Sequence, residues 1–441
     1  MTRKHNPAEA LCFWALALTW PLYAIGALYI VGPALGWALF TMVAASIYLG
    51  PAIRRDLQAA GPIPSVVWAW IIGMLSMLVV LWIGHLNWGL GTGETIKSSI
   101  GWAKGWALAA LFPLAGAVLP IRRQPLIRAM CIVGLWTLLL LPILLVAPFI
   151  HLPSRIFKSP FSIVGGPGPE YFTVFLYTMD PETFTPRWQF YAPWSPFAGL
   201  IGVVTVLFAL EDRKRFWIVA GVLAGLAMII LSSSRMSLIA VVVCVAFPRL
   251  APLARLPVTW IASTVAATSM AVFGNATLGV VQNSMAAFKG ARVSSSRVRD
   301  ALQRIAVDRW RREAPLFGHG AVERGPHIVE YMPIGSHHTW FGLLYVKGLV
   351  GLLSLLAPMA YQFWLTMVDA TRGGRGRLPF GIMLLLLQLT FGENLEIEVY
   401  LFWPAFVLLG IHAREVRLAE LAEANAPRGR QNGLIAPMAL A

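Results

Sequence analysis

Apolar stretches of about 20 residues recur along the whole chain, and they limit its possible folds more than any other feature. A helix of that length can cross the hydrocarbon core of a bilayer, which is about 30 Å thick. Charged residues make up only 12% of the sequence, against about 25% in a typical soluble domain. A membrane β-barrel would instead show segments of about ten residues with alternating polarity. The sequence therefore predicts an all-α, polytopic membrane protein.

Twelve apolar runs can be delimited, and each is expected to form one transmembrane helix. They cover residues 11–31, 34–53, 65–84, 104–120, 127–150, 195–210, 216–231, 236–248, 257–275, 339–362, 379–392 and 399–412. The runs at 236–248 and 379–392 are short, so we expect their helices to include flanking residues. The first run is long and contains Trp14, Trp20 and Pro21, which argues against a cleavable signal peptide.

The basic residues between the runs predict the orientation of the chain. If the N-terminus lies inside, every inner segment carries at least two lysines or arginines, in agreement with the positive-inside rule. Short outer connections such as 32–33 and 392–398 carry none. Both termini are therefore expected in the cytoplasm. The chain then divides into N-terminal helices with a first outer loop, central helices, a second outer loop, C-terminal helices and a tail. These parts are residues 1–194, 195–275, 276–338, 339–412 and 413–441.

The formal net charge of +15 would suggest a nucleic-acid partner in a soluble protein. Here the inner segments hold much of the basic charge, so no nucleic acid is expected. The second outer loop, 276–338, is an exception, because it carries nine basic and five acidic residues. An anionic partner would explain that excess. The cysteines lie in apolar runs without metal-ligand spacing, and we expect them to be buried small hydrophobes; they are Cys12, Cys131 and Cys244.

The two long outer loops differ in character. Residues 151–194 are rich in proline, glycine and aromatic residues, and are expected to be irregular and to lie on the membrane. In the second loop, residues 297–313 are predicted to form an amphipathic helix, with Ser296 as its cap and Pro315 just past its end. Its apolar face is expected to hold Val298, Leu302, Ile305, Ala306 and Trp310. A second face carries an arginine every seven residues, at positions Arg297, Arg304 and Arg311.

Three polar clusters could carry chemistry. In LSSSRMSL, Arg235 follows a serine-rich break between two apolar runs, an arrangement that suits phosphate oxygens. The alternative is an arginine that snorkels from a tight hairpin. The arginine stripe could bind a diphosphate, with Arg297 favoured. It could also bind anionic head groups, or Arg304, Asp308 and Arg312 could pair with one another.

The third cluster is the histidine pair His337–His338, at the point where the chain re-enters the membrane. A histidine titrates near neutral pH and can accept a hydroxyl proton. A histidine at a helix mouth can also serve only as an interfacial hydrogen-bonding group. No acidic or histidine partners stand at zinc-like spacing nearby, so we expect no metal.

Together these elements resemble the superfamily of O-antigen ligases and O-antigen polymerases, which are membrane glycosyltransferases. That family carries a Pro-Leu-x-Gly-x-Gly element, then His-Asn-x-x-Leu, then a Gly-Leu-x-Gly-Leu run about eleven residues after the histidine. Here PLFGHG spans 315–320, and eleven residues after His337 comes Gly348 of GLVGLL. His337 thus matches the family's proposed catalytic base. His338 takes the place of the asparagine and Phe341 that of the leucine.

Further residues match the family over residues 187–412. The pair Ser234–Arg235 precedes an apolar helix, as in the family, and Arg297 fits best the arginine near the start of the loop helix, with Arg299 next. Arg187 lies where the family has an arginine ahead of a Pro-Asn element. Glu393 and Asn394 stand where relatives often have polar residues before the last span.

The resemblance implies a fold, a reaction and a set of roles. The fold would be GT-C-like, with about twelve helices and two long periplasmic loops in a bacterial inner membrane. The donor would be a glycan on undecaprenyl diphosphate, and the acceptor a glycan or the lipid A core. No cofactor or metal is demanded, because a diphosphate is already a good leaving group. Chain-length or export machinery for polysaccharide would be a further partner. The expected catalytic residues are His337 and Arg297. Arg187, Arg235, Arg299 and Arg304 would bind the diphosphate, and His338 and Glu393 would be secondary.

Other classes of protein stay open. Ligase and polymerase differ in the acceptor, and the departures at His338 and Phe341 favour a polymerase of the exopolysaccharide kind. A flippase or transporter would be expected to show helices broken by glycine or proline in corresponding halves, with charges at mid-membrane. A membrane scaffold that recruits polysaccharide machinery would tolerate loss of His337.

Overall fold

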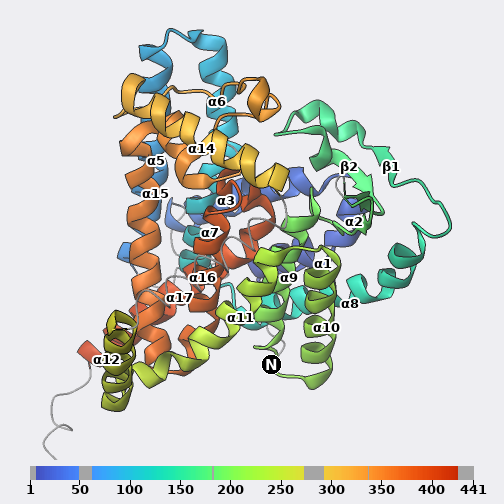
Figure 1. Cartoon of the computed structure of the whole chain (residues 1–441). Coiled ribbons are helices and arrows are strands. Elements are labelled where there is room, and N and C mark those ends of the chain that lie inside the picture. Colours follow the sequence, from blue (N-terminus) through green and yellow to red (C-terminus); the bar gives the residue numbers. More distant parts are fainter. Residues whose placement is uncertain (1–5, 49–61, 181–182, 273–292, 336, 426–441) are drawn as a thin grey trace, which may run out of the picture.

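The computed structural model describes residues 6–48, 62–180, 183–272, 293–335 and 337–425. Within these ranges the chain is mainly helical, as predicted (Figure 1). Six of the described helical segments are long and apolar enough to cross a membrane. They are α3 (Leu28–Tyr48), α5 (Ser65–Asn87), α8 (Arg123–Val146), α11 (Arg235–Leu250) with the turn up to Arg255, α15 (Thr339–Thr371) and α17 (Leu395–Ala424). Each of the twelve predicted runs contains at least one helix, but twelve crossings remain a prediction.

The remaining helices are shorter or, in the case of α14, more polar. They are α1 (Pro7–Ala17), α2 (Thr19–Ala24), α6 (Gly91–Lys104), α7 (Trp106–Val118), α9 (Ser195–Ala209), α10 (Arg215–Leu231), α12 (Pro257–Val272), α14 (Val293–Glu313) and α16 (Arg377–Thr390). The helices pack closely where they carry small residues. A Cβ atom on Gly116 of α7 would lie 2.1 Å from the Val407 carbonyl oxygen of α17. Close backbone approach of this kind is a common way to pack helices in a membrane.

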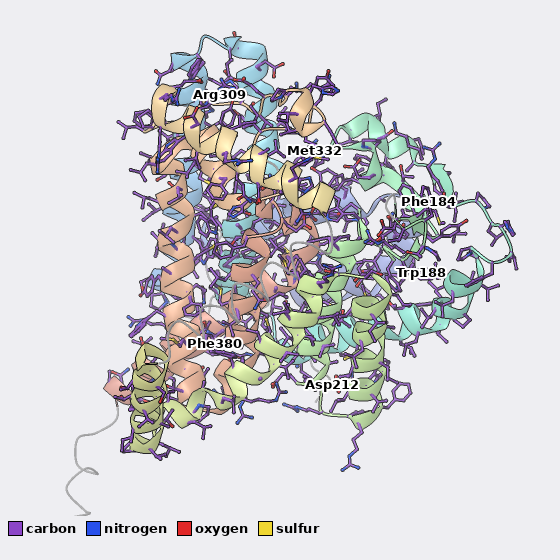
Figure 2. All side chains as sticks on the ribbon, viewed as in Figure 1. Phe184, Trp188, Asp212, Arg309, Met332 and Phe380 are labelled. Carbon is purple, nitrogen blue, oxygen red and sulfur yellow. The ribbon has the colours of Figure 1, made fainter. Side chains whose placement is uncertain are left out.

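The segments predicted to lie inside meet at one end of the bundle. Arg123 Nη1 donates to the Arg375 carbonyl oxygen (2.8 Å), and Arg128 forms an ion pair with Asp212 (2.8 Å). Arg414 donates to the carbonyl oxygens of Leu119 and Ile121. Figure 2 shows Asp212 toward this end and Arg309 at the opposite end of the molecule. These basic segments are therefore grouped at one end of the bundle, and the side of the membrane that this end faces stays a prediction.

The first outer loop is more ordered than the sequence suggested. Strand β1 (Arg155–Lys158) pairs antiparallel with β2 (Thr173–Phe175), and β3 (Thr178–Met179) pairs with β4 (Pro186–Arg187). Short 3-10 turns at Pro160–Val164 and Pro169–Phe172 lie between β1 and β2. At the other end of the chain, α17 runs through residue 413 without a break, so the last apolar run and the start of the expected tail form one helix.

The amphipathic helix of the second outer loop is present as α14. It ends at Glu313, as predicted, but it begins at Val293. The prediction of Ser296 as its cap was therefore wrong, because that serine lies inside the helix. All three cysteines are buried and free, which confirms the prediction for them.

Candidate functional site

Helix α14 contacts α15 through its apolar face, on the outer end of the bundle (Figure 1). Val298 and Leu302 are buried against Val329. Further along, Ala306 packs with Ile334 and Tyr345. The predicted apolar face of α14 is therefore its contact face, and the arginines on its other faces are left for other partners.

Arg309 fastens the second half of α14 to the bundle. Its Nη1 atom donates to Glu323 (2.7 Å) and to the Tyr345 hydroxyl (2.7 Å), and its Nε atom donates to Glu313 (3.0 Å). The guanidinium group holds the pKa values of Glu313 and Glu323 below their usual range. No local pattern predicts this role, because two of the three partners are 14 and 36 residues away from Arg309.

The PLFGHG segment fills a break in α15. At Gly348 the backbone leaves the helical conformation, with φ +62° and ψ −163°, so the neighbouring peptide groups lose their helical partners. A Cβ atom on Gly348 would lie 2.4 Å from the Leu316 carbonyl carbon, and one on Gly318 would lie 2.4 Å from the Lys347 nitrogen. Four backbone hydrogen bonds join the two segments: His319 N to Tyr345 O (2.9 Å), Gly320 N to Val346 O (2.9 Å), Leu349 N to Pro315 O (2.9 Å) and Val350 N to Leu316 O (3.1 Å).

His319 lies at the centre of this junction, and the sequence analysis assigned it no role. Its Nε2 atom is 2.7 Å from a Glu313 oxygen, and its Nδ1 atom is 3.0 Å from the Tyr345 carbonyl oxygen. Its ring stacks on that of Tyr345 and packs against Trp88. The position of a histidine between two glycines of the motif could have signalled a packed, hydrogen-bonded ring.

His337 lies just ahead of α15 in the left-handed region, with φ +61°. Its ring is partly exposed. Burial, helped by the positive charge of Arg299, lowers the pKa of His337 to about 4. The imidazole is therefore neutral near pH 7 and has a free lone pair, although the lowered pKa makes it a weaker base than an ordinary histidine. The arginine whose charge acts on it is thus Arg299 of α14. Arg297, the residue favoured from the sequence, lies two residues earlier in α14 and is exposed.

Glu393 lies in the turn between α16 and α17, and only 5% of it is exposed. Trp194 Nε1 donates to its carboxylate (3.3 Å), and Thr339 Oγ1 donates to its carbonyl oxygen (2.7 Å). Burial raises the pKa of Glu393 to about 7, although the charge of Arg299 opposes that rise. One arginine on α14 is therefore close enough to influence both His337 and Glu393.

His338 has a structural task as the N-cap of α15. Its Nδ1 atom accepts a long hydrogen bond from the backbone nitrogen of Phe341 (3.5 Å), and its ring packs on Phe341 and Phe391. Burial lowers the pKa of His338 to about 4.

An open groove of about 610 Å³ runs along α14 and reaches Phe341 in the first turn of α15. Arg304 and Arg311 of the predicted stripe line it, together with Asp300, Asp308 and Phe341. Phe341 touches the His338 ring, with 4.2 Å between the ring centroids. The groove therefore leads from two arginines to the start of α15. Asp308 of this lining also pairs with Arg312 (2.8 Å), which is one of the two pairings that the sequence left open as an alternative.

The two remaining arginines lie in neighbouring segments. Arg235 is the first residue of α11 and is exposed, and Ser234 caps that helix by accepting from the Ser237 nitrogen. Gly392 packs directly on Met236, so the start of α11 lies beside the turn that carries Glu393. The half-buried Arg187 forms an ion pair with the buried Asp180 (2.5 Å), which gives it a structural partner within its own loop.

No three histidine, cysteine or acidic side chains gather as they would around a metal ion in the described part of the chain. Comparison with known proteins gives no assignment, since neither a protein-family model nor a curated protein matches the chain.

Proposed function

We propose that this protein is a membrane glycosyltransferase that moves a glycan from undecaprenyl diphosphate to a sugar hydroxyl at the outer, periplasmic face of a bacterial inner membrane. The observation that carries the proposal is the position of His337, which lies just ahead of α15 and is influenced by the charge of Arg299. The neighbouring His338 contacts Phe341, which lines a groove together with Arg304 and Arg311. A proton acceptor and an anion-binding group are the two elements that such a transfer needs.

The reaction follows from these positions. His337 accepts the proton of the acceptor hydroxyl while its oxygen attacks the anomeric carbon of the donor sugar. The bond from that carbon to the diphosphate oxygen breaks, and undecaprenyl diphosphate leaves with the electron pair. Arg299, with Arg304 and Arg311, stabilises the negative charge that builds up on the leaving group. Arg235 would bind a more distant part of the donor head group.

The placement of buried charges favours interfacial chemistry over transport. Glu396 and Glu398 both lie in the first turn of α17, and Glu393 precedes that helix. These carboxylates are therefore gathered at the outer end of α17. A flippase or transporter without transferase activity remains the alternative, and it would be expected to place such groups halfway across the membrane.

The test is transfer by the purified protein in lipid nanodiscs, supplied with an undecaprenyl-diphosphate-linked oligosaccharide and an acceptor glycan. Loss of a general base typically lowers the rate about 10²–10⁴-fold, so His337→Gln is expected to fall within that range. Arg299→Gln is expected to lower the rate comparably. Arg312→Gln is the matched control, because this arginine is exposed on the same helix and does not line the groove. Unchanged transfer in both test variants would refute the assignment.

A deletion strain separates the two kinds of transferase. Loss of long chains with accumulation of free lipid-linked polymer indicates a ligase. Loss with accumulation of single lipid-linked repeats indicates a polymerase, which the departures at His338 and Phe341 favour.

A further inference from the structure

A second cavity of about 740 Å³ lies on the outer side of the bundle. Helices α5 and α6, the starts of α15 and α17, and residues 164–167 of the first outer loop all contribute to its wall. Its size is typical of small-molecule sites, which measure about 300–1,000 Å³. The groove beside His337 has a different lining, so the cavity is a separate feature.

A lysine and a glutamate from two different helices line this cavity. Lys347 of α15 is only 2% exposed, and Glu396 of α17 is the acidic residue whose charge acts on it. Burial of an ionisable side chain such as Lys347 is costly unless the side chain is paired, so a buried lysine often has a function. Gly105 makes the arrangement possible, because a Cβ atom there would lie 2.8 Å from Glu396 Cγ.

The other charges on the wall already have partners. Lys97 is on the exposed rim and pairs with Glu94 (3.3 Å). Lys104 donates to the carbonyl oxygens of Val164 (3.0 Å) and Gly165 (3.2 Å), which ties α6 to the first outer loop. The groups left for a ligand are therefore the donor of Lys347, the acceptor of Glu396, the ring of Tyr29 and the backbone of Gly166.

These groups match a neutral sugar better than an ion. An anion would be attracted by Lys347 but repelled by Glu396, and a cation would meet the reverse. Neighbouring hydroxyl groups can accept from an ammonium group and donate to a carboxylate at the same time. An aromatic ring and glycine backbone can approach the flat face of a sugar ring closely.

We propose that this cavity binds a neutral sugar unit of a glycan, with Lys347 and Glu396 hydrogen-bonding to its hydroxyl groups. The cavity and the His337 site share two elements. Lys347 lies on α15, which begins just after His337, and Glu396 lies in the first turn of α17, just after Glu393. The sugar bound here would belong to the acceptor glycan. That part of the inference rests on the proposed transferase function.

The experiment measures sugar binding by the full chain in nanodiscs, with saturation-transfer NMR as the readout. The probes are the methyl glycosides of glucose, galactose, mannose and N-acetylglucosamine. At least one is expected to bind, and Lys347→Met and Glu396→Gln are each expected to weaken its binding at least tenfold. Lys97→Met, on the exposed rim, is the matched control and should stay within twofold. Thermal unfolding of each variant verifies that it is folded.

The outcomes separate this inference from the proposed function. His337→Gln should bind the sugar normally while it no longer transfers a glycan. If the wild type transfers a glycan normally but binds none of the methyl glycosides in this cavity, the inference is overturned and the proposed function stands. Sugar binding without any transfer by the wild type would do the opposite. The inference is refuted if none of the four sugars binds, or if Lys347→Met and Glu396→Gln both bind the sugar as the wild type does.

Discussion

Gly348 is a sensitive position in the junction between PLFGHG and α15, and Gly348→Ala is a sharp test of that junction. The backbone there combines φ +62° with ψ −163°, a region that residues other than glycine almost never adopt. A Cβ atom would also lie 2.4 Å from both the carbon and the oxygen of the Leu316 carbonyl group. Neither PLFGHG nor α15 can move to relieve this clash without breaking the hydrogen bonds between them.

The backbone strain and the Cβ clash together set the expected loss of stability in Gly348→Ala. A residue forced into such a conformation costs about 1–3 kcal/mol. Relief of the clash would lengthen the four backbone hydrogen bonds, each worth about 1 kcal/mol net. If half of that contribution is lost, the junction is destabilised by about 3–5 kcal/mol in total.

Hydrogen exchange followed by mass spectrometry, on the protein in nanodiscs, measures this directly. Peptides that contain His319, Gly320, Leu349 and Val350 should exchange at least about 100-fold faster in Gly348→Ala, because each 1.4 kcal/mol corresponds to a factor of ten. Gly93→Ala is the control, since Gly93 is within α6 and a Cβ atom there would meet nothing within 4 Å. Exchange within twofold of the wild type in Gly348→Ala would show that the junction does not hold the break in α15.

Three further predictions follow from single contacts. Asp180→Asn removes one partner of the buried pair with Arg187, so the first outer loop should lose about 3 kcal/mol of stability, seen as faster limited proteolysis there with unchanged cleavage elsewhere. Glu393→Gln should stabilise the protein by up to about 3 kcal/mol above pH 7 and by little near pH 4.5. The pKa of Glu393 in the folded protein, about 7, exceeds the ordinary 4.5, so the wild type loses stability as the pH rises from 4.5 to 7. A difference in unfolding free energy between variant and wild type that stays the same at low pH would contradict this. Arg309→Met breaks the contacts with Glu313, Glu323 and Tyr345, so amides of α14 should exchange at least tenfold faster, whereas Arg312→Met should leave them unchanged.

The local patterns of the sequence predicted those parts of the fold that depend on them. Apolar runs of membrane-spanning length marked the helices, and the spacing of Val298, Leu302 and Ala306 marked the face of α14 that is buried. The start of α14 was missed because the serines at 294–296 can either cap a helix or continue it, and sequence alone does not decide between the two.

Long-range pairing could not be predicted in the same way. Arg309 and His319 each find partners through the return of α15 beside α14, which no local pattern records. Arg299 rather than Arg297 acts on His337 because the docked helix presents that position to it. Lys347 could have been found earlier, since a lone lysine inside an apolar run is itself a signal.

The interrupted helix α15 imposes an order on biosynthesis. The ribosome delivers residues 315–320 of the second outer loop before 345–350, and the earlier residues must be in place beside α15 when the later ones arrive. Otherwise the peptide groups around Gly348 would enter lipid without acceptors or donors, at a cost of several kcal/mol each. A truncation or an inverted insertion of that loop would therefore leave an incomplete last third of the bundle, a natural target for quality-control proteolysis.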